Sequence, residues 1–413
     1  MKIALIGNMN NNGFSIMRYF NYLGIETHLF LFQNDGKGPF EHFKPENDTW
    51  EYEKWEKYIH RMKISNGYRG IIGYPEKLEF PFYSLYLKNL FKDFDKLIGT
   101  GIAPAIFSRA GLKLDIFYPY SMGIEYVKNI PTANRLKNGN PLIKMLCEYT
   151  KKLQINGIKE SNFCLNFDFG LTQQTFNEIN CNFINLSIPM VYNLENNYLE
   201  LIPKELKEIS NKIKSFDLSI LSHSRHLWVK NDFFSEEEWF YNTKNNDWLI
   251  RGFSKIVKEV NKKSLLVLFE YGESILESKK LINELNIEEN IIWLPKMSRK
   301  EIMFLLSSVD IGVGEFYNIE KTIWGGTGWE ILASGKPLLQ SFRFNKGEFK
   351  EITGYDEPKL LNVLKEEDIF THLANFFEKK EEYVKLGKDL KDWFDKFNGL
   401  NLAKQWINIL EKL

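Results

Sequence analysis

The sequence predicts an α/β protein made of two doubly wound, Rossmann-like domains. Short apolar stretches typical of buried strands alternate with amphipathic stretches typical of helices, and this alternation begins twice, near residue 2 and near residue 216. Alternating strands and helices form parallel sheets covered by helices. A chain of 413 residues also suits two or three domains. We therefore expect a first domain over residues 1–195, a second over 216–395, and a terminal helix, 396–413, able to pack back on the first.

The composition argues against several classes of site and partner. Hydrophobic residues make up 44% of the chain, enough for large cores. The 54 basic side chains balance the 54 acidic ones, so nucleic acid is not favoured as a partner. Cys147, Cys164 and Cys181 show no Cys-x-x-Cys spacing, which indicates neither a zinc site nor a disulfide framework. We interpret them as small buried residues of a protein in a reducing compartment.

The first residues, MKIALIGN, predict a strand rather than a signal peptide, because they contain no long apolar segment. No apolar run approaches the ~18 residues of a membrane-spanning helix. We therefore expect a cytoplasmic protein. An excess of lysine and arginine between residues 135 and 159 leaves open a contact with an anionic acceptor or with anionic lipid at the inner face of the membrane, although a solvated basic face is the commoner explanation of such an excess. The oligomeric state is not predicted.

The first domain opens with a strand, a loop and a helix. Residues 2–6 are apolar, residues 7–13 are glycine and asparagine of the kind that tolerates positive φ, and residues 14–23 have helical spacing. The start resembles a dinucleotide-binding fold. It lacks a clean Gly-x-Gly-x-x-Gly, and Asp35 is the one candidate for a ribose-binding acid, so a nicotinamide dehydrogenase is a minor alternative.

Residues 35–95 are irregular and aromatic and predict an insertion. Its aromatic side chains shape an acceptor pocket or a membrane-facing rim, or they simply pack the insertion onto the sheet. Asp93 and Asp95 have the Asp-x-Asp form that holds a metal in some sugar-transferring enzymes. Two acids at a junction between a helix and a strand are usually solvated, so we expect no metal site. Two later loops, 99–101 and 118–121, follow strands and therefore lie at the ligand-binding edge.

The most informative stretch of the second half is residues 309–339. It predicts a strand at 309–313, a loop ending in Gly325 and Gly326, a helix, and a stop at Gly335. Thr327 and Glu330 have the spacing of a capping box. A helix that begins at the carboxyl edge of a parallel sheet binds anions, because its free N–H groups and its dipole point outward. An ordinary helix start is the alternative interpretation.

Several ordered motifs of the second half resemble the retaining glycosyltransferases of family four. A strand ends in Ser222-His223-Ser224-Arg225, where that family has Gly-Arg, and Lys244-Asn245 opens a helix, where it has Lys-Gly. Further on come Trp293-Leu294-Pro295, Val309-Asp310, Trp324-Gly325 and a run from Glu330 to Pro337. The first half agrees with that family by topology alone. The resemblance implies a GT-B fold, with two domains facing across a cleft.

One position departs from the family pattern. The family has a first glutamate eight residues before the second, and here Thr322 stands at that position. Glu315 or Glu320 would then take over the contact with the donor sugar.

The resemblance implies transfer of a sugar from a nucleotide-diphosphate sugar to a glycan or lipid-linked acceptor, with retention and without a metal or other cofactor. Arg225 and Lys244 would stabilise the departing diphosphate. Glu330 would accept hydrogen bonds from the ribose. The other donor-binding residues would be Gly325, Gly326, Thr327, Gly7, Asn10, Asn12 and Gly13, and the acceptor side would be Gly99, Thr100, Gly101, Tyr118, Tyr120 and Ser121.

Other interpretations remain open at this point. Arg225 also suits a surface ion pair, and His223 and His226, which flank it, are as typical of structural histidines as of a catalytic base. A sugar-nucleotide epimerase of the same fold would need the same donor residues, whereas a phosphorylase would need a pyridoxal-phosphate lysine for which we find no motif. The substitution of Thr322 for glutamate favours a third alternative, a non-catalytic subunit that binds nucleotide-sugars.

Overall fold

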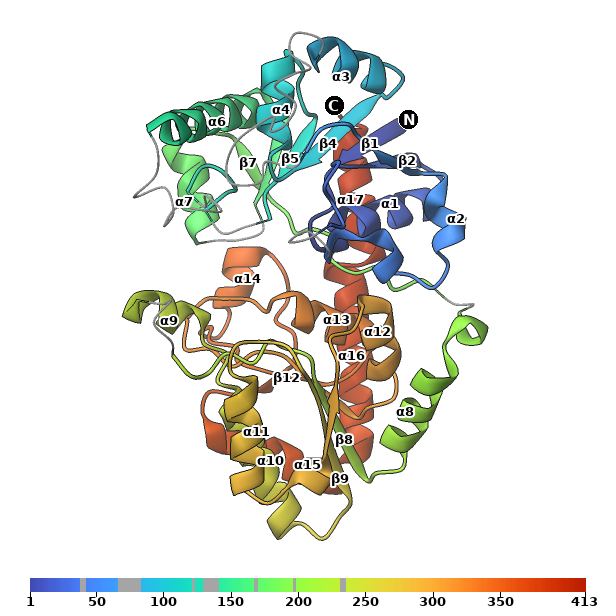
Figure 1. Ribbon diagram of the computed structural model, residues 1–413, viewed down its shortest axis with the longest axis vertical. Helices are drawn as coiled ribbons and strands as arrows, with labels where there is room; N and C mark the ends of the chain where they lie inside the picture. The colour runs from blue at the N-terminus through green and yellow to red at the C-terminus, as the bar shows by residue number, and fades with distance from the viewer. Residues whose placement is uncertain are drawn as a thin grey trace. The chain divides into compact units, whose positions relative to one another are not determined.

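The computed structural model describes residues 1–37, 42–65, 83–120, 123–128, 141–166, 170–195, 198–230 and 235–413. The chain divides into two compact units. Unit 1 comprises Met1–Tyr192 and Phe397–Leu413, and unit 2 comprises Asn193–Lys396. Both chain termini therefore belong to unit 1 (Figure 1).

Unit 1 is built on a fully parallel sheet. Among its described residues seven strands pair in the order β3-β2-β1-β4-β5-β6-β7. The strands are β1 (Lys2–Ile6), β2 (Glu26–Leu31), β3 (Ile59–Arg61), β4 (Lys96–Thr100), β5 (Ile116–Tyr118), β6 (Phe163–Asn166) and β7 (Phe183–Asn185). The central strands are continuous apolar runs because both of their faces are buried.

Helices cover both faces of this sheet (Figure 1). One face packs against α3 (Tyr83–Phe91), α4 (Ala103–Ala110), α6 (Pro141–Glu160) and α7 (Leu171–Glu178), whose apolar side chains share a core with Ile6 and Phe30. On the other side lie α1 (Asn12–Tyr22) and α17 (Leu400–Leu410), which contact each other. The short helix α2 (Tyr52–Glu56) precedes β3.

The terminal segment completes unit 1. Trp406 of α17 is fully buried, its ring lies edge-on to Tyr118, and its Nε1 donates to the carbonyl of Ser187 at 2.9 Å. Asn398 accepts a hydrogen bond from the backbone N–H of Met190 at 3.0 Å and donates to the carbonyl of Ile188 at 2.8 Å. These contacts tie the last residues to the segment that follows β7.

Unit 2 has a second fully parallel sheet, of six strands in the order β10-β9-β8-β11-β12-β13. They are β8 (Leu218–Ser222), β9 (Ser264–Phe269), β10 (Ile291–Leu294), β11 (Ile311–Val313), β12 (Leu338–Gln340) and β13 (Leu361–Asn362). The helices are α8 (Lys204–Lys214), α9 (Glu236–Asn242), α10 (Asn246–Glu259), α11 (Ile275–Glu284), α12 (Arg299–Leu306), α13 (Gly326–Ser334), α14 (Glu348–Thr353), α15 (Glu366–Glu378) and α16 (Lys380–Phe397). Side chains of α10, α11 and α15 form one core with the sheet.

Each sheet contains one point at which the strand order reverses. In unit 1 it lies between β1 and β4, and in unit 2 between β8 and β11, because helices leave these two neighbours toward opposite faces. Ligands of doubly wound proteins bind outside the carboxyl ends of the strands at such a point. The architecture therefore marks one candidate edge in each unit.

The predicted α/β class with two doubly wound sheets is confirmed. Several elements were not predicted from the sequence, and three of them show why. β3 lies inside the stretch interpreted as an insertion, α8 lies between the two expected domains, and β13 has only two residues. Neither strand contains a long apolar run, and α8 buries only Leu206, Ser210 and Ile213, so none of the three carries a strong hydrophobic pattern.

Among the described residues no helix is both long enough and apolar enough to cross a membrane. Nor do the described residues contain a group of three or more His, Cys, Asp or Glu side chains that is able to hold a metal ion.

Replacing Trp406 by Ala is expected to lower the free energy of unfolding of unit 1 by about 3–5 kcal/mol, because it opens a cavity and removes a buried hydrogen bond. Urea unfolding followed by circular dichroism measures the change. Lys404→Ala, an exposed position on the same helix, is the control and should stay within about 0.5 kcal/mol of the native protein. Equal stability of the two variants would show that α17 does not complete the core.

Candidate functional site

Polar side chains gather at the carboxyl edge of the sheet in unit 2. His223 directly follows β8, Glu315 comes two residues after β11, and Arg299 is the first residue of α12 after β10. Glu330 lies in the second turn of α13. Since the carboxyl ends of parallel strands all lie at the same edge, these residues lie at the edge that carries the reversal of the strand order.

Both carboxylate oxygens of Glu330 are held by hydrogen bonds at this edge. Its Oε2 accepts a hydrogen bond from Nε2 of His223 at 2.7 Å, and its Oε1 accepts one from Nε of Arg299 at 2.7 Å. Burial raises the pKa of Glu330, but the charge of Arg299 and the hydrogen bond from His223 outweigh burial and lower the pKa to about 2. The carboxyl group is therefore ionised at neutral pH, although its residue is only 7% exposed.

The ionised carboxylate determines which nitrogen of His223 carries a proton. A carboxylate only accepts hydrogen bonds, so Nε2 of His223 must donate. Nδ1 of the same ring is buried and has no hydrogen-bond partner. His223 is thus a buried polar group whose second nitrogen is uncommitted.

The capping box expected from Thr327 and Glu330 is wrong. Helix α13 begins at Gly326 with Gly325 as its N-cap, and no side chain caps it. Glu330 is therefore two positions beyond the third helical residue, from which a side chain reaches the N-cap, and it pairs with His223 and Arg299 instead. Oγ1 of Thr327 is buried without a hydrogen-bond partner. The first N–H groups of α13 remain available to an anion.

A second polar pair lies beside the start of α13. Nζ of Lys244 contacts Oε2 of Glu315 at 2.8 Å, and both side chains are largely buried. A Cβ on Gly325 would lie 3.6 Å from the same carboxylate oxygen, so Glu315 is adjacent to the helix N-terminus. This places Lys244, Glu315 and Gly325 in one small region.

The backbone of Glu315 is held in place by the side chain of Gln340. The side-chain amide of Gln340 accepts from the N–H of Glu315 at 2.8 Å and donates to its carbonyl at 2.7 Å. A Cβ at Gly314 would lie only 1.9 Å from Oε1 of Gln340, so position 314 requires glycine. Gly314 and Gln340 together thus determine the backbone position of Glu315 at the edge of the sheet.

The turn that carries Lys244 explains one departure from the family pattern. Asn245, at the position where family four has glycine, is the N-cap of α10 and has the left-handed φ of 44°. Asparagine tolerates this conformation better than other non-glycine residues. Its Nδ2 also donates to the carbonyl of Phe316 at 2.8 Å, which joins this turn to the loop after β11.

Arg225 lies apart from these two groups in the described contacts. Its guanidinium is 3.9 Å from the carboxylate of Glu273, and its side chain is 34% exposed. Glu320, the other substitute considered for the missing glutamate, is exposed, and Thr322 is half-buried.

In unit 1 the loop after β1 packs closely on the end of β4. A Cβ at Gly7 would lie 3.0 Å from Cγ2 of Thr100, and a Cβ at Gly13 would lie 2.5 Å from the carbonyl of Gly7. Gly7, Asn10 and Gly101 all have positive φ. The backbone shape of this edge therefore depends on glycine and asparagine.

Several predicted side chains of unit 1 share this edge. Asn10 donates to the hydroxyl of Tyr120, whose own N–H donates to Oε1 of Glu125 at 2.6 Å. Tyr118 is buried, and burial together with Glu125 raises its pKa well above its usual range. Asn12 is 1% exposed, and neither polar atom of its side chain has a hydrogen-bond partner.

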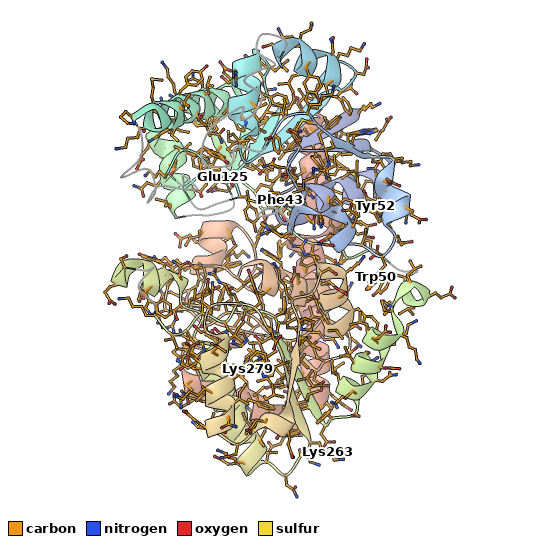
Figure 2. The ribbon with its side chains drawn as sticks, viewed as in Figure 1. Phe43, Trp50, Tyr52, Glu125, Lys263 and Lys279 are labelled. Carbon is orange, nitrogen blue, oxygen red and sulfur yellow. The ribbon has the colours of Figure 1, made fainter. Side chains whose placement is uncertain are left out.

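The remaining residues predicted for this edge have other surroundings. A Cβ at Gly99 would lie 2.7 Å from Leu114, so this glycine serves close packing. Ser121 lies outside the described residues. The carbonyl of Phe43 accepts a hydrogen bond from Nδ2 of Asn8, and Oε1 of Glu125 accepts one from the N–H of Tyr120; Figure 2 labels Phe43 and Glu125.

Solved glycosyltransferases have the same architecture. Anabaena HepE in complex with UDP is 11% identical and aligns over 100% of both chains with a TM-score of 0.61. A glycosyltransferase from Rickettsia africae ESF-5 is 15% identical and aligns over 100% of this chain and 98% of its own, with a TM-score of 0.59. Sucrose-phosphate synthase from Thermosynechococcus elongatus is 10% identical, covers 100% and 99%, and has a TM-score of 0.53.

The fold is GT-B. At these identities the likeness is one of fold. No protein-family model matches the chain, and no curated protein sequence matches it.

Within this GT-B fold, two side chains that bind Glu330 were not predicted from the sequence. Arg299 was not considered, and His223 was considered but not assigned. A basic residue at the first position of a helix that follows a buried strand is a weak signal for Arg299. Glu330 is 31 positions from Arg299 and 107 from His223, so no local pattern reveals these pairs.

The ionised state of Glu330 makes stability depend on pH. Its folded pKa of about 2 is below the ordinary 4.5, so the stabilisation is complete above pH ~4.5 and is lost as pH falls toward 2. The difference between the folded and the ordinary pKa corresponds to about 3 kcal/mol of stability, because one pKa unit is worth about 1.4 kcal/mol. Urea unfolding of native protein and Glu330→Gln between pH 7 and 3 should show a stability gap that narrows below pH ~4.5. A gap that is constant with pH would contradict this assignment.

Proposed function

We propose that the protein is a glycosyltransferase that moves a sugar from a nucleotide-diphosphate sugar to a hydroxyl of a glycan or lipid-linked acceptor. The observation that carries this proposal is the buried, ionised Glu330 beside the uncapped start of α13, at the reversal point of the sheet. This edge offers a fixed acceptor of hydrogen bonds next to donors for an anion, and a nucleoside diphosphate requires both.

Glu330 suits the ribose. A carboxylate has about four acceptor positions, and His223 and Arg299 each occupy one. The remaining positions are able to accept the two neighbouring hydroxyl protons of a ribose. Because both oxygens are already held in place, the carboxylate needs no rearrangement to bind them, and its pKa of about 2 keeps it an acceptor at any physiological pH.

Positive charge for the diphosphate comes from three sources. Helix α13 supplies its first N–H groups. Lys244 lies close to them, because it forms an ion pair with Glu315, whose carboxylate is adjacent to Gly325 at the helix start. Arg225 is the second cation of the proposal. Its ion pair with Glu273 is long and partly exposed, and such pairs contribute little, so the guanidinium is able to turn to a phosphate at low cost.

These groups would act mainly on the leaving group. When the bond from the anomeric carbon to the diphosphate breaks, negative charge grows on the departing phosphate, and preorganised cations and N–H groups stabilise it. A metal-independent reaction with retention, in which the departing phosphate takes the acceptor proton, is part of the proposal. Glu315 is the proposed contact to the donor sugar in place of the glutamate missing at Thr322.

The acceptor is proposed to bind unit 1, at the edge that carries Thr100, Gly101, Tyr118 and Tyr120. The exposed Met145 and Tyr149 on α6, a helix that also carries four lysines, favour an acceptor at a membrane surface over a soluble one. A peripheral membrane contact of a cytoplasmic protein is accordingly part of the proposal.

UDP is the first nucleotide to test, because structures of Anabaena HepE contain UDP, UDP with glucose, and UDP-glucose. UDP at about 100 times its Kd should stabilise the native protein by ~2.7 kcal/mol in a thermal-shift assay. Glu330→Gln should weaken UDP binding by about ten- to a hundred-fold, as expected for lost hydrogen bonds to a charged group. Glu320→Gln, an exposed acid in the loop before α13, is the matched control and should bind like the native protein.

If UDP, GDP, ADP and dTDP all leave the melting temperature of the native protein unchanged, the nucleotide site is absent and the proposed function is wrong. If Glu320→Gln weakens binding as much as Glu330→Gln, the ribose contact has been misplaced.

Lys244→Met is expected to lower kcat/KM for sugar transfer by about 10²- to 10³-fold, because it removes a cation that stabilises the departing diphosphate. Product formation is measured by chromatography, with each UDP-sugar assayed with and without acceptor. Lys258→Met, at an exposed lysine in the last turn of helix α10, the helix that follows Lys244, should retain native activity. A donor sugar altered in the absence of acceptor would indicate an epimerase instead.

A further inference from the structure

Two of the three cysteines meet at one side of the sheet in unit 1. Cys164 is the second residue of β6 and is fully buried, and Cys181 lies between α7 and β7 and is partly exposed. Their Sγ atoms are 3.4 Å apart, although the residues are 17 positions apart in the sequence. The equal spacing of the three cysteines in the sequence gives no indication of this contact.

The backbone holds the two thiols together. β6 and β7 are parallel neighbours, with Cys164 opposite Phe183, two residues beyond Cys181. The N–H of Cys181 donates to the carbonyl of Phe176 at 2.9 Å, which closes the turn after α7. Both thiols also lie near the carbonyl of Ile158, at 3.5 Å and 3.9 Å. The contact therefore follows from strand register and turn geometry.

The two thiols differ in reactivity. The hydrogen bond with Cys164 lowers the pKa of Cys181, and the charge of Lys159 adds to the effect. The same hydrogen bond, together with burial, raises the pKa of Cys164 well above its usual range. The partly exposed sulfur is thus the better nucleophile, and the buried sulfur lies next to it.

We propose that Cys164 and Cys181 form a reversible thiol–disulfide pair, a modification site at which low-molecular-weight disulfides oxidise the protein. Cys181 thiolate attacks one sulfur of glutathione disulfide, so that a mixed disulfide forms and one glutathione leaves as its thiolate. Cys164, having lost its proton to solvent, then attacks the sulfur of Cys181 and expels the second glutathione. The protein loses two electrons and two protons, and glutathione disulfide is reduced to two glutathione molecules.

The geometry suits the second step. A disulfide needs a sulfur separation of about 2.05 Å, so the sulfurs have to approach by only about 1.4 Å, which side-chain rotation and small backbone shifts supply. Oxidation would join β6 to the turn before β7 and enclose α7. Oγ1 of Thr172 in α7 accepts a hydrogen bond from the N–H of Gly123 at 3.2 Å. The crosslink would therefore also restrain the segment that carries Glu125.

Incubation of the full-length native protein with glutathione disulfide at pH 8, without denaturant, tests the proposal. Intact mass spectrometry should show a loss of about 2 Da, for two hydrogens, with no glutathione retained. Peptide mapping should then find Cys164 joined to Cys181. Dithiothreitol should restore the original mass.

Single variants separate the two steps. Cys164→Ala should retain one glutathione on Cys181, because the second thiol is missing, whereas Cys181→Ser should leave Cys164 unreacted. Cys147→Ala is the matched control, since burial raises the pKa of Cys147 and the proposed pair does not include it, and it should behave as the native protein does. A native protein that keeps a stable glutathione adduct on Cys181, or that does not react at all while folded, would overturn the proposal. Neither result depends on whether the variants fold.

Discussion

The carboxylate of Glu330 is the constraint around which unit 2 arranges its functional edge. A buried carboxylate without partners would become protonated, because removing its charge from water is costly. His223 and Arg299 prevent this and join three separate strand-to-helix connections to one group. The ends of β8, β10 and β11 are thereby coupled, because the connections that follow them carry His223, Arg299 and Glu330, respectively. Loss of either partner would leave the buried charge held by the other alone, and an incompletely compensated buried charge costs more than the intact interaction contributes.

The two units form similar sharp turns at their functional edges with different residues. In each unit the chain has to leave a buried strand, turn sharply and enter a helix while its backbone stays close to a neighbouring strand end. Unit 1 uses positive φ at Gly7 and Asn10, and unit 2 uses a glycine at 314 and a left-handed Asn245. The frequent asparagines at these turns are therefore a matter of backbone conformation as much as of polarity.

The predictable part of this protein was its repeated local pattern. Buried strands such as β1 and β11 were predicted because the strands of parallel sheets are apolar runs, and the class of fold follows from their alternation with helices. β13 was missed because two residues carry no periodicity. The capping-box interpretation of Thr327 and Glu330 was wrong because α13 begins at Gly326 and has no side-chain cap. Contacts between distant residues, such as that of Cys164 with Cys181, leave no trace in local spacing.

The return of the chain to unit 1 at Phe397 sets an order for folding during synthesis. All residues of unit 2 leave the ribosome before α17 does, so unit 2 is able to complete its core while unit 1 still lacks the helix that carries Trp406. Contacts between the two ends of a long chain form slowly, because a large loop has to close first. During that interval the apolar surface around α1 stays exposed. The nascent protein is therefore most open to aggregation or to chaperone binding on unit 1, although that unit is the first to be made.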